Sequence, residues 1–254
     1  TRKESSAASD VYKRQGHNKW SKIKNKKGSE DARRGKVFTK MARAITVAVR
    51  EGGADPEYNP SLKSVIEKAR AENMPNDNID RAIKKASGDG DSANYENIVY
   101  EGYGPEGVAV IVECLTDNRN RTASDVRHYF DKFGGNLGQN GSVSFMFQRK
   151  GLLLIEAESL DEEEVMMDSL DAGAEDFEAD DGIFVINTAM EDFAQVRDTL
   201  LDKGYKFVKS DLVYEPSNYV KINDESNVDK MEKLIDNLED SDDVQQVSHN
   251  WDNE

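Results

Sequence analysis

Apolar side chains recur every three or four residues between Ser29 and Gly52, and this spacing predicts an amphipathic helix. An acidic pair follows Ser29, as is common at helix starts, and a glycine pair closes the pattern. At about 100° per residue the apolar positions fall on one arc, which gives the helix a face to bury. These positions are Val37, Phe38, Met41, Ile45, Ala48 and Val49.

Two shorter helices are predicted after the first. One follows Pro60, and the other follows Pro75 and ends near Gly88, because proline is favoured in the first turn of a helix and glycine after its end. Residues 16–91 are therefore predicted to form a three-helix bundle. Its inward positions in the two shorter helices are Leu62, Val65, Ile66 and Ala69, then Ile79, Ala82, Ile83 and Ala86.

After a linker rich in Gly, Asp and Ser, the pattern changes to strands that alternate with helices. Residues 149–213 have the order βαββαβ, the ferredoxin-like arrangement of two helices on an antiparallel sheet. The last helix and strand lack a complete set of partners, so residues 92–148 and 214–254 are predicted to form one discontinuous, ferredoxin-like α/β domain around the inserted one. Strands are predicted at 95–103, 108–115, 142–148, 152–156, 175–178, 183–188, 207–214 and 244–249, and helices at 122–133, 162–172, 190–203 and around 228–238.

Charge is divided by position along the chain. Residues 16–91 hold 17 Lys and Arg against 11 Asp and Glu, whereas residues 92–254 hold 13 against 37. The overall net charge of −16 therefore conceals a basic N-terminal region. Its lysines are interleaved with Trp20 and Ile23, and most basic side chains of the first helix, Arg50 among them, fall opposite its apolar arc.

Such a surface neutralises phosphates, and an exposed indole can stack on a base, so the region is predicted to bind nucleic acid. The alternative is a solvated lysine-rich tail with Trp20 packed on the bundle. Arg34 departs from the pattern because it lies on the apolar side. The predicted nucleic-acid-binding residues are Lys19, Trp20, Lys22, Lys24, Lys26, Lys27, Arg33, Arg34, Lys36, Lys40 and Arg43.

A second candidate site consists of Arg119 and Arg121 at a helix N-terminus. Two guanidinium groups in this position suit a phosphate or a carboxylate of a partner. Internal ion pairing explains the same residues equally well, because the surrounding domain is so acidic.

No motif indicates an enzyme, a metal or a cofactor. The GYGPEG stretch at 102–107 matches a dinucleotide pattern, but it joins two strands and is interpreted as a hairpin connection. The acidic run at 161–164 is expected to favour the dipole of a helix N-terminus, and residues 180–182 are expected to form a hairpin turn. The three histidines are far apart and show no ligand spacing with Cys114, so no zinc site is expected.

Cys114 lies in an apolar run and is expected to be a buried strand residue. A single cysteine forms no internal disulfide, and no apolar run approaches the length of a membrane span. We therefore expect a cytoplasmic protein without a membrane or small-molecule partner. Residues 1–15 have no apolar h-region, and residues 10–15 resemble the translation of a transposon end used in sequencing libraries. Residues 1–15 are therefore expected to be a non-native or disordered leader.

Five motifs occur in an order that resembles the YebC/PmpR family. They are GHNKWSKIK at 16–24, DARRGKVFTK at 31–40, NMP at 73–75, YEGYGP at 100–105 and LTDNRNRT at 115–122. The resemblance implies an α+β protein of three domains, with a helical N-terminal bundle and two α/β domains around a cleft. The family's members are described as probable transcriptional regulatory proteins, and a mitochondrial translational activator is among their relatives.

Two functions follow from this resemblance. The first is a transcriptional regulator that binds DNA through the basic N-terminal domain. The second is a ribosome-associated translation factor that relieves stalling, for example at proline runs, through contact with ribosomal RNA. The sequence shows no obvious recognition helix and no dimerisation zipper, so a monomer is expected and RNA contact is favoured as the physical activity.

Overall fold

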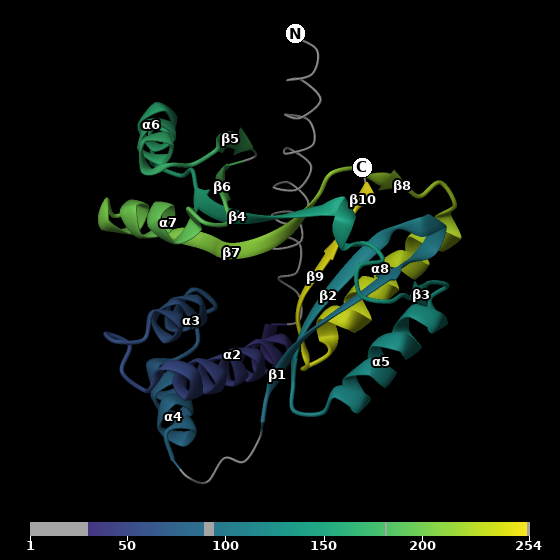
Figure 1. Ribbon diagram of the computed structural model, residues 1–254. Helices are drawn as coiled ribbons and strands as arrows, with labels where there is room; N and C mark the ends of the chain where they lie inside the picture. The colour runs from purple at the N-terminus through teal and green to yellow at the C-terminus, as the bar shows by residue number, and fades with distance from the viewer. Residues whose placement is uncertain (1–29, 89–93, 181, 253–254) are drawn as a thin grey trace. The chain divides into compact units, whose positions relative to one another are not determined.

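The computed structural model describes residues 30–88, 94–180 and 182–252, with side chains from Arg34 onward. The fold is α+β, as the sequence predicts (Figure 1). The described residues form two compact units. One is Arg149–Glu215, and the other combines Glu30–Gln148 with Pro216–Glu254. The predicted leader and the lysine-rich segment at 19–27 lie outside the described residues.

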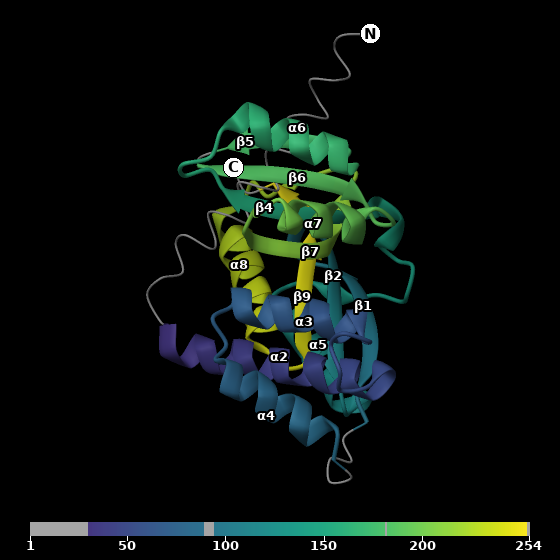
Figure 2. The same ribbon diagram turned by 90° about the vertical axis from the view of Figure 1, so that its left-hand side faces the viewer.

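The N-terminal part of the larger unit contains the three predicted helices, which are α2 (Glu30–Gly52), α3 (Pro60–Ala71) and α4 (Asn76–Ala86). Helix α2 packs against both α3 and α4 (Figure 2). The buried Asn59 joins α2 to α3, because its carboxamide accepts a hydrogen bond from the amide of Leu62 and donates to two carbonyl oxygens at the end of α2. The shared core consists of Ile45, Ala48, Val49, Leu62, Ile66, Ala69, Met74, Ile79 and Ala86.

The rest of the larger unit is built on a four-stranded sheet with the order β3-β1-β2-β9. Strands β1 and β2 pair antiparallel, and the short helix η1 connects them. The GYGPEG stretch is therefore the predicted hairpin connection. Strand β9 pairs antiparallel with β2, and a small parallel pair, β8 with β10, lies beyond it. The elements are β1 (Glu96–Tyr103), η1 (Pro105–Gly107), β2 (Ala109–Thr116), α5 (Arg119–Lys132), β3 (Asn136–Leu137), β8 (Val220–Lys221), α8 (Glu225–Asp240), β9 (Val244–His249) and β10 (Trp251–Asp252).

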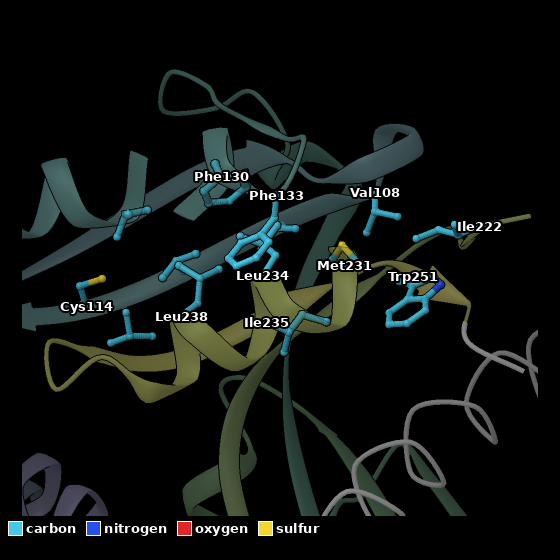
Figure 3. Packing of buried hydrophobic residues seen from close by; sticks show 14 residues of the cluster. Val108, Cys114, Phe130, Phe133, Ile222, Met231, Leu234, Ile235, Leu238 and Trp251 are labelled. Carbon is cyan, nitrogen blue, oxygen red and sulfur yellow. The ribbon is translucent and has the colours of Figure 1, made fainter. Parts of the chain in front are cut away.

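Helices α5 and α8 pack on one face of this sheet and form its main core (Figure 3). Helix α8 buries four apolar side chains at helical spacing, α5 contributes Val126 and Phe130, and Phe133 follows directly after α5. Cys114 of β2 belongs to the same core and is 2% exposed, as the sequence predicts. Segments more than 100 residues apart thus share one hydrophobic core, since β2 contacts the C-terminal helix and strand.

Cys114 is expected to be chemically inert in the folded protein. Burial raises the pKa of its thiol to about 12, so very little thiolate is present at pH 8. Labelling with a water-soluble aromatic disulfide should therefore be at least about a hundredfold slower in the native protein than in guanidinium chloride. Absorbance of the released thiol measures both rates, and Cys114→Ser gives the background. Equal rates in the two conditions would contradict the burial of this thiol.

The smaller unit contains a sheet with the order β5-β6-β4-β7. Strand β6 pairs antiparallel with both β5 and β4. Helices α6 and α7 bury apolar side chains against alternate residues of the strands, such as Leu153 and Phe184, and a second buried cluster that includes Leu154 occupies the opposite face. The elements are β4 (Phe147–Glu156), α6 (Glu162–Ala172), β5 (Asp176–Asp180), β6 (Ile183–Ala189), α7 (Phe193–Asp202) and β7 (Phe207–Pro216).

The prediction of a strand at 142–148 is wrong. Residues Ser144–Met146 form a 3-10 turn, and β4 begins only at Phe147 and continues through the strand predicted at 152–156. The cause is the buried carboxylate of Glu101, which accepts hydrogen bonds from the amides of residues 141, 143 and 144 and bends the chain there. Helix α5 begins three residues before its predicted start, because the side chain of Asn118 caps it.

Two smaller predictions are confirmed. Asp161 caps α6 by accepting a hydrogen bond from the amide of Glu164, so the acidic run belongs to a helix N-terminus. Strands β5 and β6 pair antiparallel with Asp180 opposite Ile183, which agrees with the hairpin predicted there, while Asp181 lies outside the described residues.

Candidate functional site

The basic face of α2 lies against the acidic end of α8 and the turn that leads to β9. The Lys40 ammonium donates a hydrogen bond to the carbonyl oxygen of Glu239 at 2.6 Å. One turn further along α2, Arg43 donates to the carboxylate of Asp243 at 2.5 Å and to the carbonyl oxygen of Asp242 at 2.9 Å. Lys36, closer to the N-terminus of α2, forms a solvent-exposed ion pair with the carboxylate of Asp240 at 3.2 Å. Part of the predicted basic surface therefore docks within the chain.

Burial affects the charge of Lys40. Burial lowers the pKa of this ammonium below its usual value, although the neighbouring acidic groups Glu239, Asp242 and Asp240 act in the opposite direction. The cationic form is therefore held by its partners rather than by water.

Asp243 is the centre of this junction and is almost fully buried. Its carboxylate accepts hydrogen bonds from Arg43 of α2, from Arg121 of α5 at 2.9 Å and from the hydroxyl of Thr122 at 2.7 Å. Burial alone would raise the pKa of Asp243, but the hydrogen bonds from Arg121, Thr122 and Arg43 outweigh it and lower the pKa. One carboxylate thus joins the N-terminal helices to the sheet domain.

The two arginines of the second candidate site lie in different surroundings. Arg121 forms ion pairs with Asp243 and Asp117. Its guanidinium group donates hydrogen bonds to both carboxylates, and these hydrogen bonds raise the pKa of Arg121. Arg119 is exposed in the first turn of α5. Arg121 borders an open hollow of about 250 Å³ that also contains Arg43 and several acidic side chains. The structure therefore gives Arg121 an internal partner and leaves Arg119 facing solvent.

Six of the predicted nucleic-acid-binding residues cannot be placed, because residues 1–29 lie outside the described part of the chain. This holds for Lys19, Trp20, Lys22, Lys24, Lys26 and Lys27. Arg33 belongs to α2, but its side chain is not described, and Arg34 is exposed in the first turns of that helix. Residues 30–88 contain 12 Lys and Arg against 9 Asp and Glu. The positive surplus of the N-terminal region is therefore concentrated before α2.

Helix α4 carries a basic group that the sequence analysis missed. Arg81, Lys84 and Lys85 are exposed and stand three and four residues apart, so they share one side of the helix. The buried Ile79 and Ala86 mark its inner side. The four residues between α3 and α4 match the short connection of helix-turn-helix units. The helical periodicity that predicts the apolar face of α4 also predicts that these three basic residues share a side of the helix.

Residues with metal-ligand chemistry do not gather in the described part of the chain. Among residues 30–88, 94–180 and 182–252, no group of three or more His, Cys, Asp or Glu side chains could hold a metal ion. No helix within the same ranges is both long and apolar enough to cross a membrane.

Comparisons with known proteins identify relatives over nearly the whole chain. Residues 18–89 match the model described as the TACO1/YebC protein N-terminal domain, and residues 95–251 match the TACO1/YebC second and third domain. A protein of Finegoldia magna is 99% identical over 94% of this chain and 99% of its own length. A protein of Acetivibrio thermocellus is 57% identical over 93% of this chain and 98% of its own length. Both bear the name probable transcriptional regulatory protein.

A solved structure agrees with these matches. The crystal structure of a conserved hypothetical protein from Aquifex aeolicus superimposes with a TM-score of 0.81 and 46% identity. The match covers 91% of this chain and 95% of that protein. The helical N-terminal part and the sheet-containing part each match their own family model. The chain belongs to the TACO1/YebC family.

Proposed function

We propose that the protein regulates gene expression by binding nucleic acid through its N-terminal region, with duplex DNA as the first candidate. The observation that carries the proposal is the concentration of positive charge at one end of an otherwise acidic chain. Residues 16–91 hold 17 basic against 11 acidic side chains, and a basic patch is the electrostatic footprint of phosphate binding. The names of the relatives support a regulatory role.

Two of the predicted residues have partners within the chain, and this changes the set that we propose for phosphate contact. Lys40 and Arg43 already donate hydrogen bonds to the α8–β9 turn, so we assign them to docking. We propose the lysine-rich segment at 19–27 as phosphate contacts on the strength of its sequence. We add Arg34 and the α4 group Arg81, Lys84 and Lys85, because these side chains are exposed. A basic helix after a four-residue turn suits the major groove of a duplex.

A second candidate is a translation factor that contacts ribosomal RNA. The specific observation in its favour is that the basic surplus lies mainly in residues 19–27, in a lysine-rich run that also contains Trp20 and Ile23. Phosphate contact and stacking on an indole need no base-edge readout, and RNA is commonly recognised in this way. The remaining region, with 13 basic against 37 acidic side chains, should confine either nucleic acid to the N-terminal end.

The fold details are part of the same proposal. We infer that α2, α3 and α4 form a three-helix bundle as the binding domain of a monomer in the cytoplasm. We also infer a ferredoxin-like domain at 149–213, on the strength of the βαββαβ order and the sheet order β5-β6-β4-β7. We also assign the discontinuous domain at 92–148 and 214–254 to the ferredoxin-like α/β domains.

The test is a competition at physiological salt, in which residues 16–254 choose between intact ribosomes and a pool of duplex DNA rich in promoters. Replacing Lys22, Lys24, Lys26 and Lys27 by Ala should weaken binding to the preferred target. The slope of log K against log salt should fall by about 0.7 to 0.9 for each lost phosphate contact. Removal of four exposed lysines from the acidic region is the matched control: Lys206, Lys221, Lys230 and Lys233.

The outcomes separate the candidates. Enrichment of particular duplexes that survives raised salt establishes base readout and a transcriptional regulator. Preference for ribosomes that the first lysine variant loses establishes the translation factor. An equal salt slope for the two lysine variants contradicts the proposed site in both cases.

A further inference from the structure

Helix α6 of the smaller unit exposes an apolar strip that its own fold does not use. Val165, Ser169 and Ala172 face the core. Met166, Met167 and Leu170 are 36%, 62% and 48% exposed. Residues three and four apart on a helix are neighbours, so Leu170 adjoins both methionines. We name these three side chains the α6 crest.

Acidic side chains surround the α6 crest. Helix α6 contains five Asp and Glu residues and no Lys or Arg. Residues 149–215 as a whole carry 6 Lys and Arg against 19 Asp and Glu. Lys203 reaches α6 from the end of α7, but it is already paired with Asp168 at 2.5 Å. The crest is therefore an apolar surface in a negative field.

An open hollow of about 470 Å³ lies beside the N-terminal half of α6. Leu160, Glu164 and Tyr205 line it, together with Asp168. The pair with Lys203 and the hydrogen bond from Tyr205 occupy Asp168. On the helical wheel Glu164 lies between the hollow and Met167. A cationic side chain that enters the hollow would thus meet Glu164 while its neighbours contact the crest.

From this combination of apolar crest, acidic rim and hollow, we propose that α6 is the docking surface for a cationic amphipathic segment of a partner protein. The charge decides among the possible occupants. Nucleic acid and anionic lipid are repelled by the acidic unit, and a second copy would bring like charges together at the same face. A helix with apolar side chains on one side and Lys or Arg beside them satisfies both parts of the surface.

Methionine suits such a role. Its unbranched, polarizable side chain adapts to differently shaped apolar partners, which makes it common on surfaces that accept amphipathic helices. The proposal does not depend on the basic N-terminal region, so it stands or falls separately from the proposed function.

The probe is a fluorescent 14-residue peptide of Leu and Lys with the leucines at helical spacing, titrated with the full chain and followed by anisotropy. Met167→Ser combined with Leu170→Ser should weaken its binding by about tenfold, because the exposed anchors of the surface are lost. Neither side chain is buried in the core, so the melting temperature should remain close to that of the parent protein. Methyl NMR should show Met166 and Met167 shifting on binding, while the buried Met231 does not.

Matched controls fix the location. Tyr58→Ser combined with Phe145→Ser removes two other highly exposed apolar side chains and should leave the affinity unchanged. Glu163→Gln combined with Glu164→Gln should weaken binding and reduce its salt dependence. A peptide of the same composition without helical spacing should bind at least about tenfold more weakly.

Three results would overturn the proposal. The first is equal affinity of the crest variant and the parent protein for the amphipathic peptide. The second is dependence of self-association on Met167 and Leu170 in sedimentation, which would make a second copy the occupant. The third is loss, in the crest variant, of binding to vesicles of phosphatidylglycerol, which would make a lipid surface the occupant.

Discussion

Replacing Asp243 by Ala is expected to destabilise the larger unit by about 3–5 kcal/mol. The reason is that one buried carboxylate satisfies Arg43, Arg121 and Thr122 at the same time. Its removal leaves two guanidinium groups close together without their common acceptor, although Arg121 keeps its ion pair with Asp117. Removing one member of a buried ionic network costs far more than losing a surface pair.

The neighbouring Asp242 offers a matched control. Its side chain is exposed, so Asp242→Ala removes the same charge one residue away and should change the free energy of unfolding by no more than about 0.5 kcal/mol. Urea unfolding followed by the fluorescence of Trp251, in a background where Trp20 is replaced by Phe, reports on the unit that contains the junction. Equal midpoints for the two variants would show that Asp243 does not hold the junction together.

The same carboxylate predicts how stability depends on pH. The pKa of Asp243 is lower in the folded protein than in the unfolded chain. Its contribution is therefore fully present above the unfolded value of about 3.9 and is lost as the pH falls through the folded value. The difference in unfolding free energy between the parent protein and Asp243→Ala should be constant near neutral pH and shrink in acid.

The sequence predicts the local elements well where periodicity is strong. The three N-terminal helices, the β1–β2 hairpin, the helix N-terminus at the acidic run 161–164 and the buried Cys114 are all confirmed. Each depends on residues that are close together along the chain, so propensity, capping and alternation carry the information. The acidic run at α6 was correctly assigned to a helix N-terminus for this reason.

The junction at Asp243 could not be predicted in the same way. Lys40 and Arg43 lie about 200 residues from their acceptors, at separations of 199 and 200 in sequence. A helical wheel shows that both residues lie opposite the apolar arc. The sequence pattern of an outward-facing cation is the same whether the cation contacts a phosphate, water or a carboxylate of the same chain. Only tertiary structure shows that α8 and β9 supply the partners.

The prediction of a strand at 142–148 is wrong for a related reason, because the decisive contact comes from a residue far away in the sequence. Its alternating pattern is compatible with a strand, yet Glu101, some 40 residues earlier, captures the amides of Gly141 and Val143, which lie 40 and 42 residues away. The competing hydrogen bonds to a buried carboxylate override the local preference. Glu101 lies in the YEGYGP motif at 100–105, but nothing in the sequence alone indicates which backbone groups its carboxylate binds.

Replacing Glu101 by Gln is accordingly expected to destabilise the larger unit by about 2–3 kcal/mol. The carboxylate accepts three hydrogen bonds of 2.8 Å from the amides of Gly141, Val143 and Ser144. Burial would raise the pKa of Glu101, but these hydrogen bonds outweigh it and lower the pKa. Glutamine keeps the size of the side chain but turns one acceptor oxygen into a donor amide, which would then face backbone N–H groups.

Glu96→Gln, on the same strand but exposed, is the matched control and should have little effect on stability. Hydrogen exchange should show a local consequence before any global one: the amides of residues 141, 143 and 144 lose their acceptor and exchange faster in Glu101→Gln. Since the folded pKa of Glu101 is lowered, the parent protein should show the same faster exchange only as the pH falls through that value. Unchanged protection of these three amides in the Gln variant would mean that the 3-10 turn is held by the backbone itself. The wrongly predicted strand would then need another explanation than capture by this carboxylate.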